Sequence, residues 1–142
     1  MARNPEAPLL LVRWYDYSKW LLERVDSFPK NQRFIFGTRL ADAALNIMEL
    51  LVEASYTRHK ASLLHRANVK LEQLRWLTRL AKDRNVITPR QYEYSAEQLT
   101  ECGKMLGGWL RSGTIRTVIK KCGAQIKSAR IRLPSAFAVT NR

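Results

Sequence analysis

Apolar residues recur along most of this chain at intervals of three and four, the spacing of one face of an α-helix. Four stretches show this pattern, and short segments containing Pro, Gly or polar residues separate them. Runs of β-branched residues are absent before the C-terminal end. The pattern therefore predicts an all-α protein with four helices of about 20 to 25 residues, or roughly 30–37 Å each.

The first two predicted helices cover about Leu9–Ser27 and Arg33–Tyr56. Pro8 suits a first helical turn, and Pro29 ends the first helix because proline disfavours helical backbone in the residue before it. The spacing predicts that the core-facing residues are Trp14, Ser18, Leu21, Val25 and Phe28 in the first helix and Leu40, Ala44, Ile47, Leu51 and Ala54 in the second.

The third predicted helix covers about Lys60–Arg84, and the fourth begins at Thr88. Thr88, Pro89 and Gln91 form a capping box, in which the Thr and Gln side chains each bond a free backbone N–H. We expect the fourth helix to end near Arg111–Gly113, where glycine supplies a stop. The predicted core-facing residues are Leu64, Ala67, Leu71, Leu74, Thr78 and Ala81 in the third helix and Tyr92, Ala96, Leu99, Gly103, Leu106 and Leu110 in the fourth.

Similar helix lengths and short links predict an antiparallel up-down-up-down four-helix bundle. A chain of 142 residues is long enough for one domain. We therefore assign residues 1–113 to the bundle and residues 114–142 to a basic C-terminal extension.

The charge of the chain is strongly positive and unevenly placed. There are 25 Lys and Arg residues against 12 Asp and Glu residues, which gives a net charge of +13. All twelve acids lie at or before Glu101. A positive field attracts polyanions, so nucleic acid is the first interpretation and an anionic membrane surface is the alternative. The bundle helices use their apolar faces on one another, which argues against a membrane role.

The sequence predicts a cytoplasmic protein. Its N-terminus has no signal-peptide pattern, and no stretch approaches the ~20 apolar residues of a membrane span. Cys102 and Cys122 have no spacing that indicates zinc or a disulfide scaffold.

A catalytic set is not evident in the sequence. His59 and His65 are six residues apart, on different faces of a helix, and are expected to be surface or turn residues rather than metal ligands. Cys102 lies beside an apolar seam and is expected to pack there. We therefore predict a protein that is not an enzyme, with no metal, cofactor or small-molecule substrate. A cryptic RNA-processing enzyme would need metal ligands or a catalytic histidine that the sequence does not offer.

Basic residues form stripes on the third predicted helix. Arg75, Arg79 and Lys82 share one face, and Arg66 and Lys70 form a similar pair one to two turns earlier. With no matching acidic stripe on that face, we expect contact with nucleic acid or an acidic partner, through phosphates and without sequence preference. The C-terminal extension offers a second candidate surface, formed by Arg116, Lys120, Lys121, Lys127, Arg130 and Arg132.

Three glycines lie within the fourth predicted helix, at Gly103, Gly107 and Gly108, and Trp109 follows them. Glycine costs about 1 kcal/mol relative to alanine inside a helix. Either a tight contact between helices or a subunit contact that needs small residues would explain them, and both interpretations stay open.

Two segments, Leu71–Ala81 and Gly103–Trp109, carry a resemblance to a known family, and Tyr15–Pro29 and Lys60–Ala67 fit the same pattern. The chain resembles, over about Val12–Arg111, the four-helix-bundle proteins that include the accessory variability determinant (Avd) of diversity-generating retroelements. The same group includes proteins encoded in 23S rRNA intervening sequences.

The resemblance implies a basic homopentameric barrel that binds a reverse transcriptase, template RNA and possibly cDNA. Such a barrel supports mutagenic, adenine-directed reverse transcription, while the polymerase does the chemistry. Arg75 and Arg79 would then contact a polyanion or partner, and Gly103, Gly107, Gly108 and Trp109 would serve helix packing or subunit contact. The alternative is an intervening-sequence type of protein that binds RNA without a polymerase partner.

Overall fold

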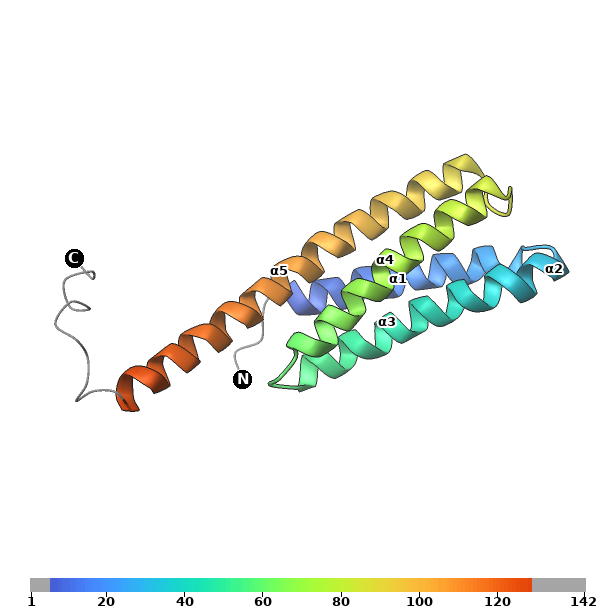
Figure 1. The fold of residues 1–142 in the computed structure, drawn as a ribbon. Helices are drawn as coiled ribbons and strands as arrows, with labels where there is room; N and C mark the ends of the chain where they lie inside the picture. The colour runs from blue at the N-terminus through green and yellow to red at the C-terminus, as the bar shows by residue number, and fades with distance from the viewer. Residues whose placement is uncertain (1–5, 129–142) are drawn as a thin grey trace. The chain divides into compact units, whose positions relative to one another are not determined.

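The structure is a computed structural model that describes the backbone of residues 6–128 and the side chains of residues 9–112 (Figure 1). The chain divides into two units, residues 1–110 and residues 111–142, and each is described by itself. The first unit contains the bundle. Of the second, the helical backbone of residues 111–128 and the side chains of residues 111 and 112 are described.

The described residues are helical and contain no strand, as the hydrophobic pattern predicts. Helix α1 spans Glu6–Asp26, and the single turn α2 (Lys30–Gln32) leads into a π-helical segment, η1 (Arg33–Gly37). Helix α3 spans Thr38–Tyr56, α4 spans Ala61–Asp83, and α5 spans Pro89–Ser128. The predicted four-helix bundle is confirmed, with the first part of α5 as its fourth helix.

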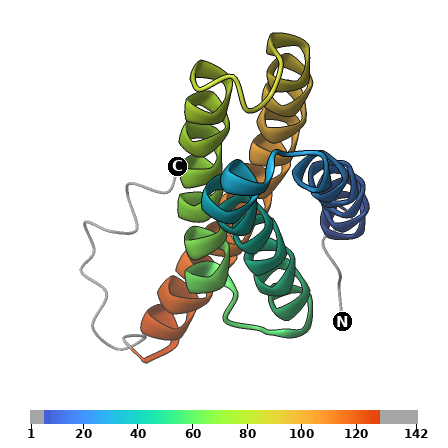
Figure 2. The same ribbon diagram turned by 90° about the vertical axis from the view of Figure 1, so that its right-hand side faces the viewer.

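Neighbouring helices of the bundle run antiparallel and are joined through buried polar contacts as well as apolar ones (Figures 1 and 2). The Trp14 indole N–H of α1 donates to the Ala44 carbonyl of α3, at 2.9 Å. The Tyr17 hydroxyl of α1 is hydrogen-bonded to the Ser95 hydroxyl of α5, at 2.8 Å. Because both pairs are buried, they fix the register of α1 against its two neighbours.

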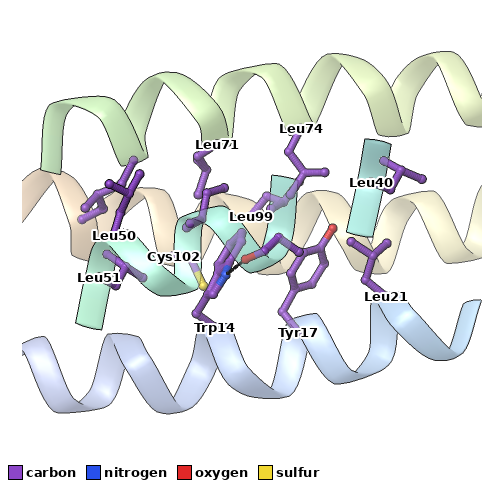
Figure 3. Packing of buried hydrophobic residues seen from close by; sticks show 14 of the residues in the cluster. Trp14, Tyr17, Leu21, Leu40, Leu50, Leu51, Leu71, Leu74, Leu99 and Cys102 are labelled. Atoms are coloured by element: carbon purple, nitrogen blue, oxygen red, sulfur yellow. Dashed lines mark hydrogen bonds between the residues drawn. The ribbon is translucent and has the colours of Figure 1, made fainter. Parts of the chain in front are cut away.

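The core consists mostly of the residues that the spacing predicts (Figure 3). All the core-facing residues predicted for the first three helices are buried. Leu80 of α4, although apolar, is about half exposed. The buried face of α4 is therefore narrower than its sequence indicates.

The core-facing residues that we predicted for the fourth helix are wrong by one position along much of the helix. Among the described side chains of α5, the buried ones are Ser95, Leu99, Cys102, Leu106 and Trp109, whereas Tyr92, Ala96, Gly103 and Leu110 are only partly buried. Hydropathy favours alanine over serine in a core, but the buried bond to Tyr17 satisfies the Ser95 hydroxyl. Cys102 occupies the position that we assigned to Gly103, as a small apolar residue can.

The C-terminal end of α4 and the N-terminal end of α5 are both capped. The Gln91 N–H donates to Thr88 Oγ1 at 3.1 Å, and the Thr88 N–H donates to Gln91 Oε1 at 3.0 Å, which is the predicted capping box. At the end of α4, Asn85 has a φ of 60°. The Asn85 N–H donates to the Lys82 carbonyl, and the Val86 N–H donates to the Ala81 carbonyl. This is a Schellman motif, in which asparagine takes the left-handed position usually held by glycine.

The predicted end of the fourth helix, near Gly113, is wrong, because α5 continues to Ser128. A single glycine costs a helix only about 1 kcal/mol and does not end it without a proline or a left-handed residue after it. The next proline is Pro134.

The chain turns between α1 and α3 through α2 and η1, which we call the corner (Lys30–Gly37). The helix after Pro29 begins at Lys30, three residues before the predicted start at Arg33. A Cβ added at Gly37 would lie 2.9 Å from Val25 Cγ1, so glycine lets the corner pack closely on α1. Phe36 and Gly37 are buried, while Phe34 and Ile35 are exposed.

Candidate nucleic-acid interface

Arg75, at the centre of the predicted basic stripe, joins α4 to α5 instead of projecting freely. Its Nη2 donates to the Leu99 carbonyl at 3.2 Å, and its Nε lies 3.1 Å from Glu72 Oε1. A Cβ added at Gly103 would lie 2.7 Å from Arg75 Nη2. Gly103 therefore leaves the space that the guanidinium occupies, which is a contact between helices of one chain.

The other two bases of this face have contacts of their own. The Arg79 guanidinium lies 5.6 Å from the Trp76 ring, within range of a cation–π interaction. Lys82 Nζ lies 4.7 Å from the Tyr92 ring and 3.7 Å from Asp83 Oδ1. A single acid, Glu72, reaches this face and pairs with Arg75, because side chains three residues apart on a helix are neighbours.

Arg66 and Lys70 lie on the other flank of α4. At about 100° per residue, Arg66 is about half a turn of the helix away from Arg75. Between the two flanks, Val69, Trp76 and Leu80 point outward, with exposed fractions of 46%, 66% and 49%. We call these three residues the α4 strip. The outer side of α4 is thus an apolar strip with basic residues on both sides.

The remaining glycines and Trp109 lie in the last part of the bundle helix. Gly107 and Gly108 are partly buried, and Trp109 is buried in the core. Lys60 Nζ lies 5.4 Å from the Trp109 ring. Among the described residues the Trp109 indole N–H has no hydrogen-bond partner.

The corner is a basic surface that the sequence reasoning missed. Lys30, Arg33 and Arg39 are exposed there, next to Phe34 and Ile35. The available signal was the absence of any acid between Asp26 and Asp42. It was overlooked because three bases spread over ten residues make no regular stripe on a helix.

The described residues offer no evident nucleophile or metal site. Burial raises the pKa of the Cys102 thiol to about 11, so it stays protonated and unreactive near neutral pH. Burial also raises the pKa of Tyr17. His59 and His65 are exposed. Among the described side chains, those of residues 9–112, no three His, Cys, Asp or Glu residues gather as metal ligands would.

The second candidate surface lies outside the described side chains. Arg116, Lys120, Lys121 and Lys127 belong to the helical backbone of α5, and Arg130 and Arg132 lie outside the described residues altogether. Their contact with phosphate stays a prediction. Within the described part of the chain, no helix is both long enough and apolar enough to cross a bilayer.

Comparison with known families agrees with this architecture. A model of the bAvd-like family matches residues 9–113, which is nearly the whole bundle. The chain belongs to the bAvd-like family. Membership indicates an accessory role in diversity-generating retroelements, of a non-catalytic kind. No curated protein matches the chain in a sequence search.

Proposed function

We propose that this bAvd-like protein is the accessory subunit of a diversity-generating retroelement. In this role it binds the reverse transcriptase and the template RNA, holds them together, and supports adenine-directed mutagenic reverse transcription. The observation that carries the proposal is the family match over residues 9–113. The net charge of +13 supports it, because a basic surface attracts RNA at any sequence.

The basic residues of α4 have different roles in this proposal. Arg66, Lys70, Arg79 and Lys82 contact the polymerase or nucleic acid from the two flanks of the helix. Arg75 instead holds α5 in place, since its guanidinium donates a hydrogen bond to the Leu99 carbonyl of α5 and forms an ion pair with Glu72 of its own helix. The bases of residues 114–142 add phosphate contacts.

The proposal includes assembly into a closed ring, for which the family resemblance implies five subunits. A ring needs two different surfaces that meet head to tail. The bundle exposes the α4 strip and a second apolar surface on α3, formed by Leu45, Val52 and Tyr56. Apolar surfaces of this kind on a soluble protein mark contact sites, which supports the assignment of both to subunit contacts.

The intervening-sequence interpretation is the second candidate. It predicts an RNA-binding bundle without a polymerase partner. The family match is to the bAvd-like group, which favours the retroelement. A reverse transcriptase gene adjacent to the gene for this chain would separate the two.

Co-purification tests the proposal. The tagged chain is co-expressed with the reverse transcriptase encoded nearest to it and captured with and without RNase. Recovery of the polymerase in both cases supports direct contact, and recovery only without RNase makes RNA the bridge. No recovery in either case would contradict the proposal. Arg79→Glu should lower recovery, whereas Arg58→Glu, the same charge change at an exposed link, should not.

A further inference from the structure

We propose that the corner between α1 and α3 is a binding site for single-stranded nucleic acid. An unpaired base stacks on Phe34, while Lys30 and Arg33 hold the adjacent phosphates. This inference rests on the nucleic-acid binding of the proposed function. It adds a specific site and the chemical form of the ligand, which is an unpaired strand.

The exposure of Phe34 is the first observation. Its side chain is 83% exposed and that of its neighbour Ile35 is 55% exposed, whereas Phe36 is buried. Leaving a large aromatic side chain in water forgoes the free energy of burial, so an exposed apolar pair is an informative exception. Phe34 and Ile35 lie in the π-helical segment η1, and such turns occur often at functional sites.

The corner that carries Phe34 is held firmly against the bundle. Gly37 packs so closely on Val25 that a Cβ there would lie 2.9 Å from the valine methyl group. Arg33 Nη2 donates to the Phe28 carbonyl at 3.1 Å, which ties the corner to the end of α1. A stacking surface on such a corner loses little conformational freedom when a base binds.

Unpaired positive charge is the second observation. Lys30 and Arg33 are both exposed, and no acid occurs between Asp26 and Asp42. Among the residues whose side chains are described, neither base has a carboxylate partner. Arg33 uses one of its five N–H donors on Phe28, which leaves its charge available to a phosphate.

The third observation is the shape of the surface. Lys30, Asn31, Arg33, Phe34, Ile35 and Thr38 line an open hollow of about 550 Å³. This lies within the range of small-molecule sites, about 300–1,000 Å³, so a base has room. The Asn31 amide can donate and accept hydrogen bonds at a base edge. Figure 1 shows this corner and the link between α4 and α5 at the same end of the bundle.

These features together favour an unpaired strand over a duplex or a protein. In a duplex, neighbouring base pairs cover the faces of each base, so Phe34 would find no surface to stack on. An apolar protein surface would cover Phe34 but desolvate Lys30 and Arg33 without pairing them, which is unfavourable. A single strand offers base faces and phosphates at adjacent positions.

The test measures binding of a fluorescent adenine RNA of about 12 nucleotides, within the site sizes of single-strand-binding proteins. Phe34→Ala should weaken binding about 10-fold, a typical loss for one stacked base. Phe34→Tyr, which keeps the ring, should bind like the wild type. Tyr15→Ala, which removes an exposed aromatic residue of α1 to which we assign no contact, is the matched control and should also bind like the wild type.

An abasic strand of the same length separates stacking from charge. Wild type and Phe34→Ala should bind it equally, since no base remains to stack. The same comparison with single-stranded DNA shows which kind of strand is preferred. Far-UV circular dichroism should be unchanged in every variant, because Phe34 and Tyr15 lie at the surface.

Three results would overturn the inference. The first is wild-type affinity of Phe34→Ala for the adenine RNA, with RNA binding itself intact, which leaves the proposed function standing. The second is a loss of affinity of Phe34→Ala for the abasic strand that equals its loss of affinity for the adenine RNA. The third is loss of polymerase capture by Phe34→Ala with RNA binding unchanged, which would make the corner a protein-docking site. If the wild-type chain binds no RNA, the nucleic-acid part of the proposed function fails together with the inference.

Discussion

The basic face of α4 and the corner between α1 and α3 have similar charge but different surroundings. On α4, Arg75 bonds the Leu99 carbonyl and Glu72, and Lys82 pairs with Asp83. At the corner, Lys30 and Arg33 have no carboxylate partner among the described side chains. The basic residues of α4 are therefore partly engaged in contacts within the bundle, whereas the basic residues of the corner are available to a ligand.

The difference shows what helical spacing can and cannot predict. Residues at i, i+4 and i+7 share a face of one helix. Whether that face is free depends on the next helix, here on the carbonyl of Leu99 and on the absence of a side chain at Gly103. The four predictions that follow test the contrast, from the largest expected effect to the smallest.

Replacing the exposed aromatic residues Trp76 and Phe34 with glutamate should have different effects on subunit assembly. Trp76→Glu should separate the ring that we propose into monomers, because a charge buried in an apolar contact costs several kcal/mol. Phe34→Glu should leave the assembly intact, since we assign the corner to nucleic acid. Sedimentation equilibrium measures the mass of each variant. The assignment of the two surfaces to different partners would be contradicted if both variants dissociated or if Trp76→Glu kept the wild-type mass.

Removing charges at the two sites should change RNA binding unequally. The double change Lys30→Ala and Arg33→Ala should lower affinity for single-stranded RNA about 10-fold and reduce the salt slope by about 1.4, or about 0.7 per phosphate contact. The matched pair Arg75→Ala and Lys82→Ala removes the same charge and should change the slope less. Titrations at several salt concentrations give both slopes, and equal slopes would contradict the assignment.

Arg75 and Arg79 should differ in their effect on stability. Arg75→Ala should lower the free energy of unfolding by about 1 kcal/mol, because it removes a bond between helices. Arg79→Ala, an exposed change four residues later, should stay within about 0.5 kcal/mol of the wild type. Urea denaturation of both variants measures this. Equal stability of the two would mean that Arg75 contributes nothing to the bundle.

The smallest effect concerns Gly103. Gly103→Ala gains about 1 kcal/mol of helix propensity but displaces the Arg75 guanidinium. Its net effect on the free energy of unfolding should therefore be near zero. In an Arg75→Ala background nothing is displaced, and the same change should stabilise by about 1 kcal/mol. A double-mutant cycle in urea measures the coupling, and a value near zero would show that the two residues do not interact.

Much of the fold could be predicted from the sequence, because the apolar positions of the first three helices have regular spacing. The register of α5 could not, since Ser95 is buried through its bond to Tyr17, a residue 78 positions away in the chain. The extension of α5 past Gly113 was missed because glycine weakens a helix without ending it.

The candidate site was less predictable than the fold. The spacing placed Arg75 and Arg79 on one face, but only the packing of α4 against α5 shows that Arg75 is engaged. Phe34 is exposed in the π-helical segment η1, whereas hydropathy assigns a phenylalanine to the core by default. Residue type alone therefore predicts neither point.

The central claim is that this protein enables a polymerase to copy its template RNA with errors at adenines. Purified reverse transcriptase and template RNA should be incubated with and without the wild-type protein, and the cDNA sequenced. We expect cDNA with substitutions at template adenines only when the protein is present. Equal amounts of cDNA with equal adenine errors in its absence would contradict the claim.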